Sequence, residues 1–580
     1  MTFRVHLPSS FGPCPHRALR GALTALALYL LSAASPATAQ LARPVGPVTT
    51  SAPAIAPRYD AQALNGVLEK GTALESQARW GDALSHYEEA LRNNPSEPTL
   101  RQREDLAKLH WSLEKRYADH SFVESLQSLG PDQAAGLYME LLRKINAHYV
   151  VDPPWQQLAA RGARAIDLGL ADEDFCAANG VKLTAEQLAP ARQQMYQLIA
   201  GRTLAAPSDL VALAAEVART LESQCGLKQT SSLMEFVAAA AGGLDEYSAY
   251  LTADQLRDVY SQIEGNFVGL GVELKADNGA LLIVHVIPGS PAERAGVLDN
   301  DRIVAVDGRP TAPMSTDEAA SLLTGVAGSY VQISAVTAGQ PPRTLTVRRE
   351  QVEVPSLEKV SIVDKSEGVA YIRVPAFQKT TSRDLEKALW DLHRQGMRSL
   401  ILDLRGNPGG LLTAAVEVAD KFLQQGSIVS TRGRSPQEDF NYQAHYGGTW
   451  RVPLVVLIDG DSASASEIFA GAIKDNARGI VVGERSYGKG SVQGIFPLGF
   501  AGAGVRLTTA LFYSPNGVKI SHVGVAPDQE VRNAAKPAAE AGQGSQLTVI
   551  DPAVNKGPDA VLQAGIAAAV EAAKARVAQR

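Results

Sequence analysis

The sequence predicts a multidomain α+β protein with three parts in order: a helical N-terminal region, a glycine-rich segment of strands and loops, and an α/β core. Residues 58–260 repeat Leu and Ala at three- and four-residue spacing with few β-branched runs, which is typical of helices. Residues 262–350 contain glycine-rich loop-and-strand patterns. Over residues 355–531, apolar strands alternate with helical segments, which favours an α/β core.

The composition is that of an ordinary globular protein. A chain of 580 residues allows three or four domains, and 45% of the residues are hydrophobic and 20% charged. The formal net charge of -6 gives no reason to expect a nucleic-acid partner. The sequence contains neither H-E-x-x-H nor paired Cys-x-x-Cys, so we expect no metal and no other cofactor.

Residues 1–39 have the pattern of an export signal. Basic Arg17 and Arg20 precede the apolar run 22–34, which is too short to span a bilayer. Ala37-Thr38-Ala39 supplies a cleavage pattern, so we expect a mature chain from Gln40, exported to the periplasm and soluble or peripherally attached to the inner membrane. An uncleaved anchor is the alternative. The Pro-, Ala-, Thr- and Ser-rich residues 40–57 favour a flexible linker.

Two cysteines, Cys176 and Cys225, remain after cleavage at this site. An oxidising compartment would permit one disulfide between them. Two reduced, buried thiols are equally compatible with the sequence, because it does not give their separation in space.

A helical hairpin is predicted near residues 64–97. The segment from Trp80 to Leu91, with Pro95 after it, resembles a tetratricopeptide hairpin. One hairpin cannot bury both of its faces, so it must pack on neighbouring helices. Either a stabilising cap or a docking site for a substrate or an adaptor protein fits this region.

The end of the chain carries two further predictions. Residues 506–521 read as a hairpin with a type I′ turn at Asn516-Gly517. Residues 532–580 form an Ala-rich tail with a predicted helix at 559–577, to which the sequence assigns no role.

The candidate catalytic residues lie within residues 451–494. An apolar strand at 452–458 leads through small residues into a helix at 467–476, and a second strand at 479–482 leads into a glycine-rich loop. Ser464 therefore stands where a strand turns into a helix, and Lys489 stands in the loop.

Each of these two residues has a simpler interpretation. Ser464 and Glu467 fit the S-x-x-E capping box, in which the hydroxyl accepts from the Glu467 amide and does nothing else. Residues 483–489 spell G-x-x-x-x-G-K, most of a phosphate-binding loop. However, Gly490 follows instead of Ser or Thr, and the next residues read as strand instead of helix. Lys489 could also be an ordinary surface lysine.

A Ser-Lys dyad is the catalytic alternative. A serine hydroxyl needs a base to take its proton, and an uncharged lysine can be that base. At a pKa of about 10.4, only about one lysine in a few thousand is neutral at pH 7. A useful base needs a pKa lower by roughly three units, at a cost of about 4 kcal/mol, and hence burial away from carboxylates.

Three separated motifs occur in order: residues 403–410 (DLRGNPGG), 462–468 (SASASEI) and 482–493 (VGERSYGKGSVQ). Together they resemble the carboxyl-terminal processing, or tail-specific, serine peptidases, over about residues 244–530. The resemblance implies a crotonase-like (ClpP-like) α/β peptidase core. It also implies Ser464 as nucleophile, Lys489 as base and Gln493 as the residue that orients the lysine.

Residues 262–350 resemble a PDZ domain, through the patterns at 267–274, 288–297 and 301–308. The resemblance implies that the backbone at Leu270, Gly271 and Val272 holds a peptide carboxylate, while the peptide adds as a strand along an open edge. A glycine-rich hairpin without a ligand is the alternative. Just before this segment, Glu246 stands where the family usually has proline.

Gly409 and Gly410 end a predicted strand in a turn, and their amides are candidates, with that of Ala465, for an oxyanion hole. The family match favours Gly410. We therefore expect an exported serine endopeptidase that acts on proteins with apolar C-termini. An adaptor protein at the helical region and a homo-oligomer are both compatible with the sequence. Two alternatives are an inactive PDZ and helical-repeat adaptor, and a crotonase-type enzyme. The latter needs a coenzyme A pocket, and no basic phosphate-binding cluster is evident in the sequence.

Overall fold

The computed structural model describes residues 2–5, 61–277, 280–312, 322–445, 447–532 and 559–578. The chain forms two compact units, residues 7–111 and residues 1–6 with 112–580. The predicted linker at 40–57 and most of the predicted signal at 1–39 lie outside the described residues. No helix in the described ranges is long and apolar enough to cross a membrane.

The smaller unit contains the predicted hairpin as helices α1 (Ala61–Ser76) and α2 (Trp80–Asn93), followed by residues 98–111 of helix α3 (Pro98–Ala118). Tyr87 is fully buried, and its hydroxyl donates to Glu75 at 2.7 Å. The rings of Trp80 and His110 stack with centroids 3.8 Å apart. The hairpin therefore buries one face with help from α3, as a lone hairpin must, while its tetratricopeptide character stays a prediction.

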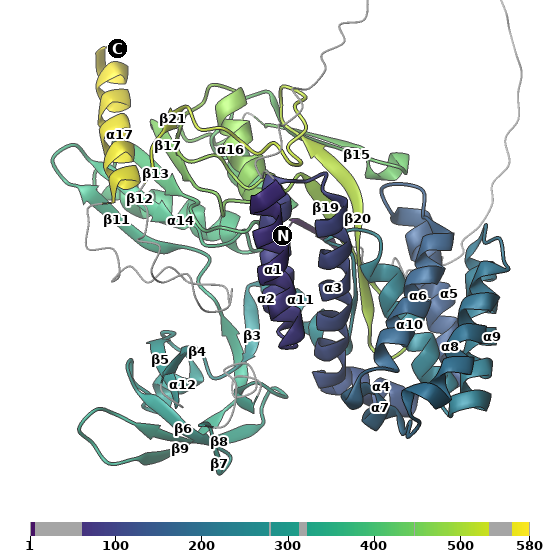
Figure 1. Ribbon diagram of the computed structural model, residues 1–580. Coiled ribbons are helices and arrows are strands. Elements are labelled where there is room, and N and C mark those ends of the chain that lie inside the picture. The colour runs from purple at the N-terminus through teal and green to yellow at the C-terminus, as the bar shows by residue number, and fades with distance from the viewer. Residues whose placement is uncertain are drawn as a thin grey trace, which may run out of the picture. The chain divides into compact units, whose positions relative to one another are not determined.

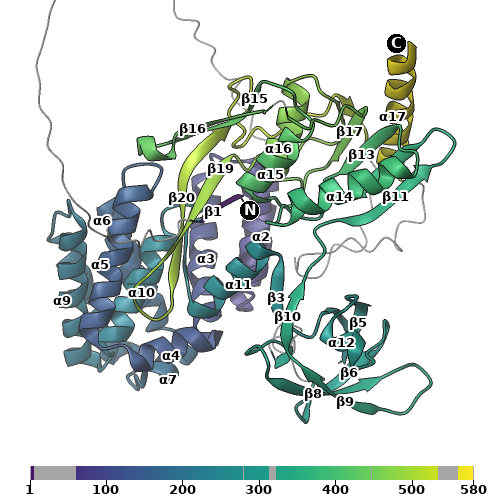
Figure 2. The same ribbon diagram turned by 180° about the vertical axis from the view of Figure 1, so that it is seen from behind.

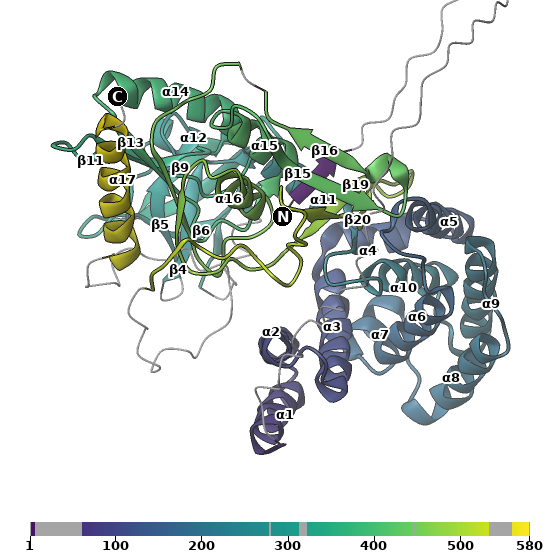
Figure 3. The same cartoon turned by 90° about the horizontal axis from the view of Figure 1, so that it is seen from above.

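A helical bundle opens the larger unit. Its core helix is α10, in which every residue from Thr230 to Ala241 is buried, and Figure 3 shows it inside the bundle. Cys176 and Cys225 are free thiols in this bundle. The helices of the bundle are α4 (His120–Ser128), α5 (Pro131–His148), α6 (Trp155–Gly169), α7 (Glu173–Asn179), α8 (Ala185–Ala200), α9 (Pro207–Cys225) and α10 (Gln229–Gly242).

Strand β2 (Ala249–Leu251) and helix α11 (Ala253–Glu264) lead into the segment predicted to be a PDZ domain. Strands β3 (Asn266–Gly269) and β10 (Glu350–Glu353) pair at the two ends of this segment. Between them lies a sheet in the order β4-β5-β6-β8-β9, with β7 beside β6. Its members are β4 (Val272–Asp277), β5 (Ala280–Val286), β6 (Arg302–Val306), β7 (Arg309–Pro310), β8 (Tyr330–Val336) and β9 (Arg343–Arg348), with the short helix α12 (Pro291–Arg294).

The α/β core is built on a sheet in the order β11-β12-β13-β17-β18-β21, in which β12 to β18 run parallel. The strands are β11 (Glu358–Asp364), β12 (Val369–Arg373), β13 (Ser399–Asp403), β17 (Leu454–Ile458), β18 (Ile480–Gly483) and β21 (Gln529–Glu530). Alternate residues of the central strands pack on opposite faces, so both faces need cover. Three helices cover one face: α14 (Thr381–Arg394), α15 (Leu412–Asp420) and α16 (Ala465–Asp475). Helix α17 (Ala560–Ala578) covers the other (Figure 1).

A second sheet lies beside the first, in the order β14-β1-β19-β20-β15-β16, with β2 on β20. Its members are β1 (Thr2–Val5), β14 (Gly410–Leu411), β15 (Ser427–Gly433), β16 (Phe440–Gln443), β19 (Ser491–Pro497) and β20 (Gly504–Tyr513). Figure 2 shows β1 alongside β19. The fold is therefore the predicted α+β combination of a helical region, a separate sheet of strands β4 to β9 and an α/β core.

One local prediction was wrong. Gly517 has φ +76°, but Asn516 is not among the residues with positive φ, so the turn is not type I′. After the turn, the chain pairs with β20 through one isolated β-bridge, between Tyr513 and Lys519. The Ser514 amide also donates to the Val518 carbonyl at 2.9 Å. The Asn-Gly pair marks a turn here, but it does not set up a two-stranded ladder.

Candidate active site

Ser464 lies at the junction between β17 and α16, on the strand-to-helix turn expected from the sequence. Its φ of +58° and ψ of -112° are rare for a residue with a side chain, and such strain persists only where surrounding contacts hold it. Those contacts come from the loop before α16. The Asp459 carboxylate accepts from the Gly406 amide at 3.0 Å and from the Ser462 hydroxyl at 3.1 Å.

The Ser464 hydroxyl is fully buried and has no hydrogen-bond partner within the described residues. The capping interpretation of this hydroxyl is therefore wrong: the Glu467 amide bonds to the Ser464 backbone carbonyl instead, at 2.9 Å. The reciprocal half of the capping box does form, because the Ser464 amide donates to Oε2 of Glu467 at 2.8 Å. The hydroxyl itself remains available for chemistry.

Glu467 connects Ser464 to the loop of Lys489. Its Oε2 accepts from the Lys489 amide at 2.8 Å as well as from Ser464, and its Oε1 accepts from the Gly488 amide at 2.7 Å and the Ser486 hydroxyl at 2.6 Å. Burial raises the pKa of this carboxyl, while the four hydrogen bonds act to lower it. One buried carboxylate thus brings together two residues that the sequence separates.

Lys489 is buried, with 6% of its surface exposed. Its Nζ lies 4.3 Å from the centroid of the Tyr247 ring. Burial is the main cause that lowers the pKa of Lys489 to about 8, and the Arg506 guanidinium lowers it further, whereas Glu246, Asp245 and Glu467 raise it. The surface-lysine interpretation is therefore wrong. The phosphate-loop interpretation also fails, because β19 follows the loop where a helix would be needed.

Gln493 lies in β19, fully buried. Its Nε2 donates to the Ser491 hydroxyl at 2.9 Å, and its Oε1 has no partner within the described residues. A free acceptor beside a lysine loop suits a residue that orients an amine, although here the oxygen makes no bond to Lys489.

Gly410 is held by strand pairing to Phe377. The Phe377 amide bonds to the Gly409 carbonyl at 2.8 Å, and the Leu411 amide bonds to the Phe377 carbonyl at 2.7 Å. In a parallel ladder the groups of the intervening residue point the other way, so the Gly410 amide faces away from Phe377. Asn407 joins this loop to that of Ser464, since its carbonyl accepts from the Ala463 amide and the Ser466 hydroxyl, each at 3.0 Å.

Ala465 is the first residue of α16. The amides of a helix's first turn have no acceptor within the helix and can bind a negative charge. Helix α16 also packs against β14, which carries Gly410. The two predicted oxyanion donors thus belong to neighbouring elements.

An extended chain fits between β14 and β19. Strand β1 runs parallel to both, with Thr2 opposite Gly410 and Phe3 opposite both Leu411 and Gln493. A strand in this slot lies directly beside residues predicted to serve the chemistry. The slot therefore has the form expected for a peptide substrate, which binds proteases as an extended strand.

The predicted carboxylate-binding residues of the PDZ segment lie at the start of β4. The Leu270 carbonyl accepts from the Ala292 amide at 2.8 Å, and the Gly271 carbonyl accepts from the Ile287 amide at 3.0 Å. Val272 pairs with Val286 on β5. Because β4 is an edge strand of its sheet, its other side can receive a peptide strand.

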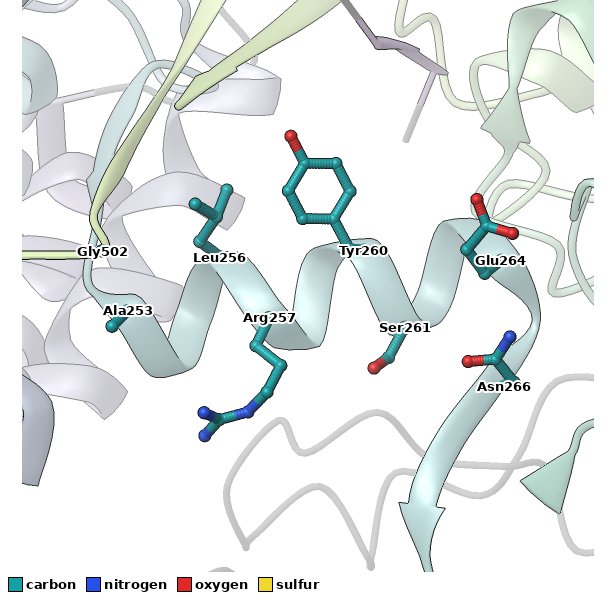
Figure 4. A pocket seen from close by; sticks show the side chains of 8 residues that line it. All are labelled: Ala253, Leu256, Arg257, Tyr260, Ser261, Glu264, Asn266 and Gly502. Atoms are coloured by element: carbon teal, nitrogen blue, oxygen red, sulfur yellow. The ribbon is translucent and has the colours of Figure 1, made fainter. Parts of the chain in front are cut away.

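Three residues escaped prediction as parts of the site: Glu467 as the connector, Asn407 and Tyr247. Glu467 was visible only as half of a capping box, and Asn407 and Tyr247 only as letters within motifs. A pocket of about 400 Å³ lies along α11 and is lined by Leu256, Tyr260 and neighbouring residues, none of which was predicted to be functional (Figure 4). The described residues contain no group of three or more His, Cys, Asp or Glu side chains that could hold a metal.

The fold and the comparisons with known proteins define a serine-type peptidase with an inserted PDZ domain. The model of peptidase family S41 matches residues 368–531, and a PDZ domain model matches residues 282–333. A carboxy-terminal-processing protease of Bartonella bacilliformis is 39% identical over 320 residues, which cover 53% of this chain and 70% of that protein. The chain belongs to peptidase family S41, with the carboxy-terminal-processing proteases.

A second relative agrees. A carboxyl-terminal-processing protease of Picosynechococcus is 36% identical over 294 residues, covering 50% of this chain and 70% of that one. Among solved structures, the photosystem II D1 C-terminal processing protease is 26% identical, with a TM-score of 0.38, and the match covers 69% of this chain and 93% of that chain.

Proposed function

We propose that this peptidase is an exported serine endopeptidase that recognises protein C-terminal tails through its PDZ domain and cleaves peptide bonds with a Ser464–Lys489 dyad through an acyl-enzyme. The observation that carries the proposal is the Glu467 carboxylate, one oxygen of which accepts from the amides of both Ser464 and Lys489. This carboxylate oxygen joins the backbone of Ser464, whose hydroxyl has no hydrogen-bond partner among the described residues, to the backbone of Lys489, a buried lysine with a lowered pKa.

In this mechanism Ser464 Oγ attacks the carbonyl carbon of the scissile bond while neutral Lys489 takes the hydroxyl proton. The amides of Gly410 and Ala465 stabilise the oxyanion of the tetrahedral intermediate. The C–N bond then breaks, the departing amine receives the proton from Lys489, and an acyl-Ser464 ester remains. Lys489 next takes a proton from water, whose oxygen attacks the ester carbon. The bond between that carbon and Ser464 Oγ then breaks, Oγ receives the proton from Lys489, and the carboxylic acid product leaves. Gln493 orients the amine throughout.

Tail recognition would use the PDZ segment. A peptide whose carboxylate is held at Leu270, Gly271 and Val272 could extend along the edge of β4. Holding the tail raises the local concentration of the same chain at the active site, without any new contact there. Apolar C-termini are the proposed substrates.

The test is digestion of a denatured protein with an apolar C-terminal tail by the wild type, Ser464→Ala and Lys489→Ala. Lys474→Ala is the matched control, because Lys474 lies on α16 and pairs with Asp528 at 3.1 Å. We expect cleavage by the wild type and Lys474→Ala alone, and weaker cleavage when the tail is amidated. Cleavage that survives Ser464→Ala would refute the dyad.

The competing proposal is an inactive adaptor, and one observation favours it: the Ser464 hydroxyl has no base bonded to it in this structure. A serine-reactive probe separates the two. Labelling that is lost in Ser464→Ala supports the peptidase, and a chain that neither reacts nor cleaves supports the adaptor.

Export is part of the proposal and has its own test. Sequencing the N-terminus of the protein recovered from the periplasm should give a chain that begins at Gln40. A chain retained in the cytoplasm with residues 1–39 intact would contradict it. An adaptor bound to the helical region and a homo-oligomer stay predictions.

A further inference from the structure

The ammonium of Lys489 contacts an aromatic ring instead of its expected partners. Its Nζ lies 4.3 Å from the centroid of the Tyr247 ring. Ser464 Oγ and Gln493 Oε1 each have no hydrogen-bond partner within the described residues, so neither is bonded to the lysine. The structure therefore holds the base on the Tyr247 ring, without a hydrogen bond to the nucleophile.

The position of Tyr247 is fixed by its backbone. Its amide donates to the Asp245 carboxylate at 2.8 Å, and its carbonyl accepts from Nε of Arg506 at 2.8 Å. Two residues later, Ala249 pairs with Arg506 in the ladder of β2 and β20. The ring is thus attached to β20 on one side of the site.

Lys489 is attached to the neighbouring strand. It lies two residues before the start of β19, and β19 pairs with β20 along its whole length. Its amide is held by Glu467. With both backbones fixed, the flexible four-carbon stem of the lysine can move its amine between the Tyr247 ring and Ser464 without rearrangement of the strands.

We propose that Tyr247 is a positioning residue for Lys489, whose ring face holds the ammonium in the resting enzyme and releases the neutral amine toward Ser464. The proposal rests on the proposed Ser464–Lys489 dyad. A ring face attracts a cation through its quadrupole and has little attraction for a neutral amine. Loss of the lysine proton therefore breaks the ring contact and produces the base in one event.

Other charges also face Lys489. Arg506 from β20 lowers the pKa of the amine, whereas Glu246 and Asp245 from the Tyr247 segment, and Glu467 from α16, raise it. The ring acts in the same direction as these carboxylates, because it stabilises the charged form. Removing the ring should lower the pKa of Lys489, which lies at about 8 in the intact site.

The test is the pH profile of kcat/KM for the wild type, Tyr247→Phe and Tyr247→Leu. Activity should rise with pH through the pKa of Lys489, since only the neutral amine accepts the Ser464 proton. Tyr247→Phe keeps the ring face and should keep the inflection. Tyr247→Leu should move the inflection to lower pH by about 0.5–1.5 units.

Tyr260→Leu is the matched control, because this partly buried tyrosine lies on nearby α11 and lines the pocket of Figure 4 instead of contacting Lys489. It should leave the inflection unchanged. An inflection at the same pH in Tyr247→Leu as in the wild type would overturn the proposal. A fall in activity without a shift would assign Tyr247 a purely structural role, and would overturn it too.

A second readout does not need turnover. In a Ser464→Ala background, labelling of Lys489 by acetic anhydride at a series of pH values, followed by mass spectrometry, reports when its amine loses the proton. The labelling midpoint should be lower with Tyr247→Leu than with Tyr247. Equal labelling midpoints would overturn the proposed role of Tyr247, whether or not the protein cleaves substrate. Cleavage that survives Ser464→Ala would instead overturn the Ser464–Lys489 dyad.

Discussion

Glu467 shows how one side chain can determine the geometry of a site without touching substrate. Four donors converge on its buried carboxylate, two on each oxygen. Two of them are the amides of Ser464 and Lys489, so a displacement of this carboxylate moves both residues. A carboxylate only accepts hydrogen bonds, so it can face four donors. Protonation of Glu467, or its replacement by glutamine, would place a donor group against these donors and break the arrangement.

We expect Glu467→Gln to lower kcat on the order of 100-fold, because the amide NH₂ would face backbone donors and displace the loop of Lys489 by a fraction of an ångström. KM for a tailed substrate should change little, since the PDZ segment is far away in sequence and separately folded. Steady-state kinetics measure both constants.

The matched control is Glu140→Gln. Glu140 also accepts a backbone amide, that of Gly499 at 2.8 Å, but it lies on α5. An unchanged kcat in Glu467→Gln, or an equal fall in the control, would contradict the role of Glu467.

Gly410 gives a second prediction for a single residue. A Cβ at this position would lie 2.1 Å from the Phe377 carbonyl oxygen, and the φ of +133° is strained for any other residue. Gly410→Ala should therefore displace the predicted oxyanion donor and lower kcat by about 100-fold or more.

Gly447→Ala is the control, because a Cβ there meets no atom within 4 Å. Its kcat should equal that of the wild type. If Gly410→Ala cleaved as fast as this control, the Gly410 amide would have no part in catalysis.

Among the elements, α17 has a structural role that its sequence did not disclose. It buries Val561, Ala568 and Ala569 against the face of the central sheet opposite α14, α15 and α16. Before it, Asp559 accepts two hydrogen bonds from Arg405, which also binds Asp403 at the end of β13. The tail therefore completes the core and is anchored close to the loop that carries Asn407 and Gly410.

Gly565 of α17 lies against Leu457 of the sheet. A Cβ there would lie 2.8 Å from a methyl carbon of Leu457. We expect Gly565→Leu to lower the free energy of unfolding by about 1–3 kcal/mol through overpacking. Calorimetric melting measures this effect. The exposed Ala575→Leu, on the same helix, should melt like the wild type, and equal melting of the two variants would argue against the packing of α17.

For the whole molecule, the PDZ domain is an insertion with adjacent ends. Asn266 on β3 pairs with Glu353 on β10, so the chain enters and leaves the domain at the same place. The domain also has its own apolar core, formed by buried residues of its strands such as Ile283, Ile303 and Ile333. Such an insertion can be removed while the peptidase core stays folded.

We expect a chain in which a short glycine linker replaces residues 267–352 to keep the melting transition of the peptidase core. It should lose preference for a free over an amidated C-terminus, so that the ratio of kcat/KM for the two tails falls to about one. The intact chain should keep a ratio above one in the same assay. A preference that persists after excision would locate carboxylate recognition outside the PDZ domain.

The order of the three regions, the PDZ and peptidase resemblances, and the loops that carry Ser464 and Lys489 could all be predicted from the amino-acid sequence. Those features depend on local periodicity, turn residues and motif spacing, which neighbouring residues fix. The turn at Asn516 was mistaken because the flanking chain does not form a ladder there.

Three contacts could be seen only in the folded structure. Glu467 joins the nucleophile to the lysine loop, Tyr247 contacts the Lys489 ammonium, and α17 covers the sheet. Each of these contacts joins residues from different elements. These contacts form because strands and helices pack together and because buried polar groups then need hydrogen-bond partners from other elements. No local sequence pattern encodes which partners they meet.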